Sequence, residues 1–162
     1  MNTATIRSAT EADVPLVLQL IRELAEYERL AHEVTATERE LHDSLFSVHP
    51  QAEVVIADVD GRPAGYALYF HNYSTFLCKR GLYLEDLFVR PEFRGRGIGT
   101  ELLRYLARLA VERGCMRFEW AVLDWNQPAI DFYRGLGAIR LDDWRVFRLT
   151  GPALHELARQ TS

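Results

Sequence analysis

The chain has 162 residues, of which 48% are hydrophobic and 26% are charged, as in an ordinary soluble globular protein. The formal net charge of −4 argues against a nucleic-acid partner and favours a cationic small molecule. The only two cysteines, Cys78 and Cys115, have no metal-ligand spacing around them, so neither a disulfide framework nor a metal site is expected.

The N-terminal region begins with a predicted strand and leads into a helix. Residues 1–13 are polar and have no basic segment followed by an apolar core, so no export is expected and a cytoplasmic location fits best. Thr3–Ser8 is extended in character. Thr10 and Asp13 have the spacing of a helix N-cap, and apolar residues recur at helical intervals over 14–25. No apolar run is long enough to span a membrane.

A second helix and a hairpin are expected next. Thr35 and Glu38 form a second capping pattern, which predicts the start of that helix. Residues 53–58 and 64–70 are rich in Val, Ile, Tyr and Leu, and Asp60-Gly61 between them is a tight-turn signal. These two segments are therefore predicted to be antiparallel strands.

The second half of the chain alternates strands with helices. A strand over 82–89 runs into a glycine-rich loop, and an apolar stripe then predicts a helix from Ile98 onward. The remaining expected elements are a strand over 118–122, a helix over 128–136, a strand pair over 138–141 and 145–149, and a short final helix. We therefore expect one α/β (α+β) domain over 1–162, with a mixed sheet of about six to seven strands flanked by helices.

The loop Arg94-Gly95-Arg96-Gly97-Ile98-Gly99 is the most informative motif. A strand that enters a helix through such a loop leaves backbone N–H groups free to bind an anion. Glycines permit positive φ and close approach to a diphosphate, while Arg94 and Arg96 add positive charge. A flexible turn is the alternative. Neither the Lys-Ser/Thr of an ATP loop nor the position of a dinucleotide fingerprint is present, so another nucleotide-linked ligand is indicated.

This loop resembles the Arg/Gln-x-x-Gly-x-Gly/Ala motif of the GCN5-related N-acetyltransferase superfamily. Further segments resemble its diamine, or spermidine/spermine, branch: residues 20–28, Tyr83-Leu84-Glu85-Asp86, and 125–133. The resemblance implies the superfamily fold and direct transfer of an acetyl group from acetyl-coenzyme A to an amine in a ternary complex. No covalent acetyl-enzyme is required, so Cys78 and Cys115 are interpreted as core or incidental thiols.

Two residues match the superfamily's proton-transfer positions. Tyr133 matches the tyrosine that acts as general acid near the sulfur, although its ring could instead pack in the core beside Phe132. Glu85 matches the acidic residue that binds the substrate and assists deprotonation, although it could instead be a solvated or salt-bridged carboxylate. Asp86 is secondary, because in a regular strand it faces the opposite side.

The resemblance also implies the contacts of the cofactor. The backbone of 87–89 would hold the pantetheine arm as an added strand would, and the loop would hold the pyrophosphate. Asn126 matches a cofactor-contacting asparagine but could also be an ordinary N-cap. The complete predicted cofactor set is Leu87, Phe88, Val89, Arg94, Gly95, Arg96, Gly97, Ile98, Gly99, Thr100, Asn126, Pro128, Ala129 and Tyr133.

The expected acceptor is a primary amine of a diamine, a polyamine or a lysine-like amino acid such as thialysine. The resemblance implies the positions of its contacts, and their carboxylates and aromatic rings suit a cation: Tyr27, Glu28, Glu85, Asp86, Glu119, Trp120 and Ala121. Acidic residues at a helix end are also common on a solvated surface. A protein or peptide N-acetyltransferase and a non-catalytic acyl-coenzyme A-binding protein are the alternatives. The resemblance further implies a homodimer. From charge, apolar run length and cysteine spacing, no nucleic-acid partner, no membrane partner and no metal are expected.

Overall fold

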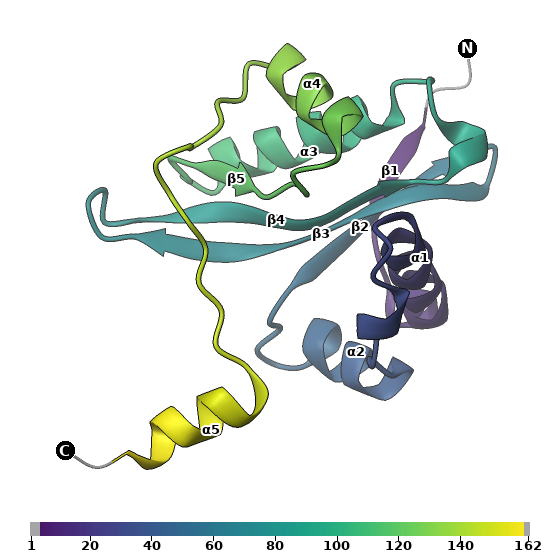
Figure 1. Ribbon diagram of the computed structural model, residues 1–162. Helices are drawn as coiled ribbons and strands as arrows, with labels where there is room; N and C mark the ends of the chain where they lie inside the picture. The colour runs from purple at the N-terminus through teal and green to yellow at the C-terminus, as the bar shows by residue number, and fades with distance from the viewer. Residues whose placement is uncertain (1–3, 161–162) are drawn as a thin grey trace. The chain divides into compact units, whose positions relative to one another are not determined.

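The structure is a computed structural model that describes residues 4–160 (Figure 1). The chain divides into two compact units, Met1–Leu123 and Asp124–Ser162, and each is described here by itself. Of the predicted first strand, Thr3 lies outside the described residues, and the strand is observed over Thr5–Ser8.

The first unit contains a five-stranded sheet in the order β1-β2-β3-β4-β5 (Figure 1). Its strands are β1 (Thr5–Ser8), β2 (Glu53–Val59), β3 (Arg62–Ser74), β4 (Lys79–Val89) and β5 (Phe118–Trp120). The first four pair antiparallel, and β4 and β5 pair in parallel. Asp60 and Gly61 take φ of 52° and 72°, which confirms the predicted turn between β2 and β3.

Helices cover both faces of this sheet (Figure 1). The apolar stripe of α1 (Val14–Tyr27), together with α2 (Glu38–Phe46), packs on one face, where Ile56, Tyr66 and Phe88 are buried. The helix α3 (Ile98–Glu112) connects β4 to β5 and contacts β4, β3 and β2. Because both faces are covered, β2 reads as a nearly continuous apolar run.

The two helix starts show one correct and one displaced prediction. Thr10 and Asp13 form the expected capping box, ahead of a short 3-10 turn, η1 (Glu11–Asp13). The second capping box joins Thr37 and Glu40, two residues later than predicted. Either pair has the right spacing in sequence, and in the structure α2 begins directly after Thr37.

The strand β4 contains a β-bulge at Glu85. Leu68 of β3 is opposite Asp86, whereas the next residue, Tyr69, is opposite Leu84. Glu85 is therefore the extra residue on β4, and the alternation of side chains is reset there. The parallel pairing with β5 also stops at Leu84, so the rest of β4 continues past the bulge without β5 beside it.

The second unit contains α4 (Gln127–Gly135) and α5 (Gly151–Arg159). The predicted strands over 138–141 and 145–149 are wrong, because the described residues between these helices form no ladder, and the sheet has five strands instead of six to seven. A strand needs a hydrogen-bonded neighbour, and β-favouring residues alone do not supply one. Val146 and Phe147, within the second of these segments, are 91% and 94% exposed.

Candidate functional site

The loop between β4 and α3 is shaped by two glycines in left-handed conformations. Gly95 has φ of 76° and Gly97, the N-cap of α3, has φ of 80°, a region that other residues enter only with strain. A Cβ atom at either position would meet no protein atom within 4 Å. The backbone alone therefore forms this surface, and a ligand can approach it closely.

The N-terminus of α3 presents backbone donors at this surface. The amide of Glu101 donates to the carbonyl of Gly97 at 3.0 Å, so helix geometry leaves the amides of Ile98, Gly99 and Thr100 without a partner inside the helix. The helix has 15 residues, and its dipole adds positive potential at this end. Donors and dipole together suit the phosphate-binding role predicted for the loop.

The side chains of the two loop arginines, Arg94 and Arg96, contact other groups of the protein. Arg94 Nε donates to the carbonyl oxygen of Val89 at 2.8 Å, and its guanidinium lies over the rings of Tyr27, at 4.8 Å, and Phe88, at 5.6 Å. Arg96 lies 5.5 Å from the ring centre of Phe93. Arg94 thus ties the loop to the end of β4 and to the end of α1, which gives it a structural role that the sequence did not indicate.

The last residues of β4 have a backbone edge that β5 does not pair with. The amide of Arg90 donates to the carbonyl of Ala64 on β3. Because backbone groups alternate between the two edges of a strand, the backbone N–H and C=O of Phe88 point toward β3 as well. Leu87 and Val89 then direct their backbone groups to the opposite edge, where Arg94 already occupies the Val89 carbonyl. Among the predicted backbone contacts, Leu87 and the Val89 amide are thus the groups available on that edge, and Phe88 is not.

The bulge brings Glu85 and Asp86 to the same face of the sheet. Asp86 is opposite Leu68 and Tyr83 is opposite Phe70, and these two β3 residues share the face covered by α1. The charge of Glu85 acts on the pKa of both Asp86 and Tyr83. The expectation that Asp86 faces away from Glu85 is therefore wrong, because it assumed a regular strand.

Asp86 is the half-buried member of this pair, and Glu85 is the exposed one. Its Oδ2 accepts a hydrogen bond of 2.9 Å from the hydroxyl of Tyr66, a residue that is fully buried. Burial raises the pKa of Asp86 to about 6, with the charges of Glu85 and Glu28 adding to the rise and the Tyr66 hydrogen bond opposing it. Burial and the Asp86 charge also raise the pKa of Tyr66, so this phenol remains a donor.

A third carboxylate, Glu28, joins them from the end of α1. Burial and the charge of Glu85 raise the pKa of Glu28. Glu28 is also the C-cap of α1, where the helix dipole is negative. The carboxylates of Glu28 and Asp86 thus add negative potential around the exposed Glu85. This arrangement attracts an ammonium group.

The raised pKa of Asp86 predicts a stability effect of the substitution Asp86→Asn. Ionising Asp86 in the folded protein costs about 3 kcal/mol relative to an ordinary aspartate, so stability is lost as the pH rises from about 4 to about 6. Asparagine carries no charge and can still accept from Tyr66. We expect it to raise the free energy of unfolding by roughly 1–3 kcal/mol at pH 8 and by little at pH 4.

Urea unfolding at the two pH values measures this effect. Asp124→Asn, at an exposed position, is the matched control and should change stability at neither pH. A loss of stability in Asp86→Asn at pH 8 would contradict the assignment of Asp86 as a strained, half-buried charge.

The three predicted substrate residues near β5 are separated by the sheet. Glu119 is opposite Tyr83 and shares the face of the carboxylates, and its charge acts on Tyr83. Trp120 is opposite Leu84 and lies on the other face, where β5 also carries Phe118 at a ring distance of 5.0 Å. Ala121 follows the end of β5. Glu119 is the one whose side chain the structure brings to the acidic face.

The other predicted cofactor residues belong to the second unit. Asn126 is the N-cap of α4, where its side chain accepts from the amide of Ala129 at 3.4 Å, with Pro128 in the first turn. Tyr133 is half-buried on α4, its ring 5.4 Å from that of Phe132. The N-cap role of Asn126 is confirmed, while the roles of Asn126 and Tyr133 in cofactor binding and catalysis remain predictions.

Tyr66 was missed by sequence reasoning, because a tyrosine in an apolar strand reads as core. The change of phase in the apolar pattern of β4, from Leu82 and Leu84 to Leu87 and Val89, is the signal that could have revealed the bulge. In residues 4–160, no group of three His, Cys, Asp or Glu side chains could hold a metal ion. No described helix has the length and apolar content needed to cross a bilayer.

Comparison with known proteins shows the family to which the chain is similar. The sequence profile of the acetyltransferase (GNAT) family matches residues 17–138. The thialysine N-epsilon-acetyltransferase of Sus scrofa is 41% identical, covering 98% of this chain and 99% of its own. The L-ornithine N5-acetyltransferase of Arabidopsis thaliana is 35% identical over 94% and 86% of the two chains. The structure of a Vibrio cholerae integron cassette protein superimposes with a TM-score of 0.82, at 27% identity and 99% coverage of both chains.

Proposed function

This chain belongs to the acetyltransferase (GNAT) family, and on that premise we propose that it transfers the acetyl group of acetyl-coenzyme A to the side-chain amine of a lysine-like amino acid. One observation carries the proposal. The carboxylates of Glu28, Glu85 and Asp86 gather at the bulge of β4, the strand that leads into the glycine-rich loop at 94–99. The substrates named for the relatives, thialysine and L-ornithine, both carry such an amine.

Acetyl-coenzyme A fits the loop surface because its pyrophosphate needs what the loop offers. The amides of Ile98, Gly99 and Thr100 would bind the phosphate oxygens, and the glycines at 95 and 97 leave room for them. The free edge of β4 at Leu87 and the Val89 amide would accept the pantetheine arm. Asn126, Pro128 and Ala129 complete the proposed cofactor contacts.

The proposed reaction is direct transfer in a ternary complex. The acceptor ammonium binds at Glu85 and gives up a proton to this carboxylate, directly or through water, so that the amine nitrogen can attack the thioester carbon. The carbon–sulfur bond breaks, and the leaving thiolate takes a proton from Tyr133. The products are the N-acetylated amine and the free thiol. A single acetyltransferase domain, a homodimer and a cytoplasmic location complete the proposal; the apolar side chains exposed over 139–149 are consistent with self-association.

Release of the coenzyme A thiol tests this function. The assay uses acetyl-coenzyme A with thialysine, L-ornithine, L-lysine, putrescine, spermidine and short peptides. Turnover with the amino acids is expected. Turnover with peptides alone would favour a protein N-acetyltransferase, and acetyl-coenzyme A binding without any thiol release would favour a non-catalytic binding protein.

The substitution Tyr133→Phe tests the general acid. A thiol has a pKa near 8.5, so its thiolate leaves readily and needs only moderate help from a proton donor. We expect kcat to fall about tenfold. The affinity for acetyl-coenzyme A, measured by calorimetry, should remain as it is. Phe132→Leu, at the adjacent ring, controls for lost packing, and an unchanged kcat at every pH in Tyr133→Phe would refute the role.

A further inference from the structure

The acidic face continues from the bulge of β4 onto β5. Tyr83 and Glu119 are opposite each other across these strands, and the pKa of Tyr83 is raised by burial and by the charges of Glu85 and Glu119. A strand rises roughly 7 Å over two residues and neighbouring strands lie roughly 5 Å apart, so an extended lysine-like chain is long enough to bridge the carboxylates of Glu85 and Glu119. An acceptor bound at Glu85 therefore reaches Glu119 with its other end.

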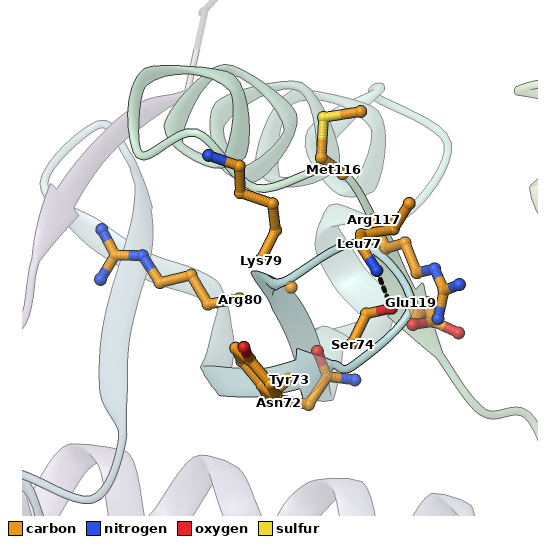
Figure 2. Close-up of a pocket in the computed structure, with 10 residues that line it drawn as sticks. Asn72, Tyr73, Ser74, Leu77, Lys79, Arg80, Met116, Arg117 and Glu119 are labelled. Atoms are coloured by element: carbon orange, nitrogen blue, oxygen red, sulfur yellow. Dashed lines mark hydrogen bonds between the residues drawn. The ribbon is translucent and has the colours of Figure 1, made fainter.

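A hollow with basic side chains lies just beyond Glu119 (Figure 2). It is lined by residues of the β3–β4 hairpin and of the segment entering β5, including Asn72, Ser74, Lys79, Arg117 and Glu119. Arg117 precedes Glu119 by two residues, just ahead of β5, and lines the same hollow. Within residues 4–160 neither Arg117 nor Lys79 forms an ion pair. These cations are thus available to an anionic group.

Gly81 leaves room for the side chain of Asn72 beside Arg117. The amide of Leu82 donates to the carbonyl of Arg117 at 2.9 Å, which places Gly81 beside Arg117 across the two strands. A Cβ at Gly81 would lie 2.3 Å from Oδ1 of Asn72, so the Asn72 side chain extends over this position. The hollow thus combines the guanidinium of Arg117 with the side-chain amide of Asn72, and both groups can bind a carboxylate.

We propose that Arg117 binds the α-carboxylate of an amino-acid acceptor, while Glu119 binds its α-ammonium. This inference rests on the proposed function and adds a specificity subsite to it. The side-chain ammonium of the acceptor is bound by Glu85 at the other end. A diamine of equal length lacks the carboxylate and places an ammonium or a methylene group beside Arg117, so it loses the ion pair.

The test compares each amino acid with the diamine that remains when its carboxylate is removed. L-lysine is paired with cadaverine and L-ornithine with putrescine, in the same thiol-release assay. We expect the protein to prefer the amino acids, and Arg117→Gln to lower kcat/KM for them roughly tenfold or more, mainly through KM, as for the loss of a charged hydrogen bond. The rates with the diamines should be unchanged or higher.

Two variants complete the experiment. Arg117→Lys keeps a positive charge but lacks the paired N–H donors of the guanidinium, so it should restore part of the preference for amino acids. Arg108→Gln, at an exposed position on α3, should leave the rates with both kinds of acceptor unchanged. Equal losses with amino acids and diamines in Arg117→Gln would overturn the subsite, as would a wild-type protein that does not distinguish the members of a pair. Failure of the proposed function looks different, because then no amine of either kind releases the thiol.

Discussion

Replacing Glu85 with glutamine is expected to lower kcat/KM for the amine roughly 100-fold, a typical contribution of a positioned acid or base. Glu85 is exposed at the bulge, whereas Asp86 is half-buried and hydrogen-bonded to Tyr66, so Glu85 is the carboxylate of the pair that a ligand contacts more readily. Glutamine keeps the size of the side chain but can neither accept the proton nor pair with the ammonium. The affinity for acetyl-coenzyme A should change little.

The same variant should shift the pH dependence. In the wild-type protein Asp86 has a pKa of about 6, so below that pH the site loses a negative charge and binds an ammonium less well. The charge of Glu85 contributes to that raised pKa, and its removal lowers the pKa of Asp86. The acid limb of kcat/KM should therefore move to lower pH in Glu85→Gln.

Profiles of kcat/KM from pH 5 to 9 measure both effects. Glu112→Gln, on an exposed position at the end of α3, is the control and should retain the wild-type profile. A Glu85→Gln enzyme with full activity at neutral pH would show that Glu85 is only a solvated carboxylate. A loss of activity in Glu85→Gln with the acid limb at its wild-type pH would show that the charge of Glu85 does not influence the pKa of Asp86. That result would contradict the predicted electrostatic coupling between these two carboxylates.

The sequence was most informative where local patterns decide the structure. The Asp60-Gly61 turn, the Thr10 capping box and the apolar stripes of α1 and α3 were all recognisable, because each depends on residues close together in the chain. The loop at 94–99 was recognisable for the same reason. Its motif includes the glycines that are needed at positive φ.

The missed features depend on partners elsewhere in the chain. The face on which Asp86 lies is decided by the bulge opposite Leu68 and Tyr69, which the assumption of a regular strand cannot reproduce. The side chain of Arg94 is held by Val89 and Tyr27, from two different elements. The segment 138–149 has β-favouring residues, but no neighbouring strand pairs with it among the described residues. Local composition determines neither register nor pairing.

The substitution Gly97→Ala should separate cofactor binding from folding. Alanine at φ of 80° costs about 1–2 kcal/mol of strain, and its methyl group would project into the space that the phosphate requires. Displacing the amides of the α3 N-terminus would remove charge-assisted hydrogen bonds, each worth roughly 1.5–3 kcal/mol. We expect acetyl-coenzyme A to bind 10-fold to 100-fold more weakly, by calorimetry.

Gly61→Ala is the matched control for this change. Gly61 has φ of 72°, and a Cβ atom there would likewise meet no protein atom within 4 Å, but this glycine lies in the turn between β2 and β3. Both variants should lose a similar free energy of unfolding, and only Gly97→Ala should lose affinity for the cofactor. S-acetyl-pantetheine, which lacks the pyrophosphate, provides a second comparison: Gly97→Ala should use it as well as the wild type does. If Gly61→Ala weakened acetyl-coenzyme A binding equally, the loss of affinity would reflect backbone strain alone. That result would contradict the assignment of the loop at 94–99 as the pyrophosphate-binding site.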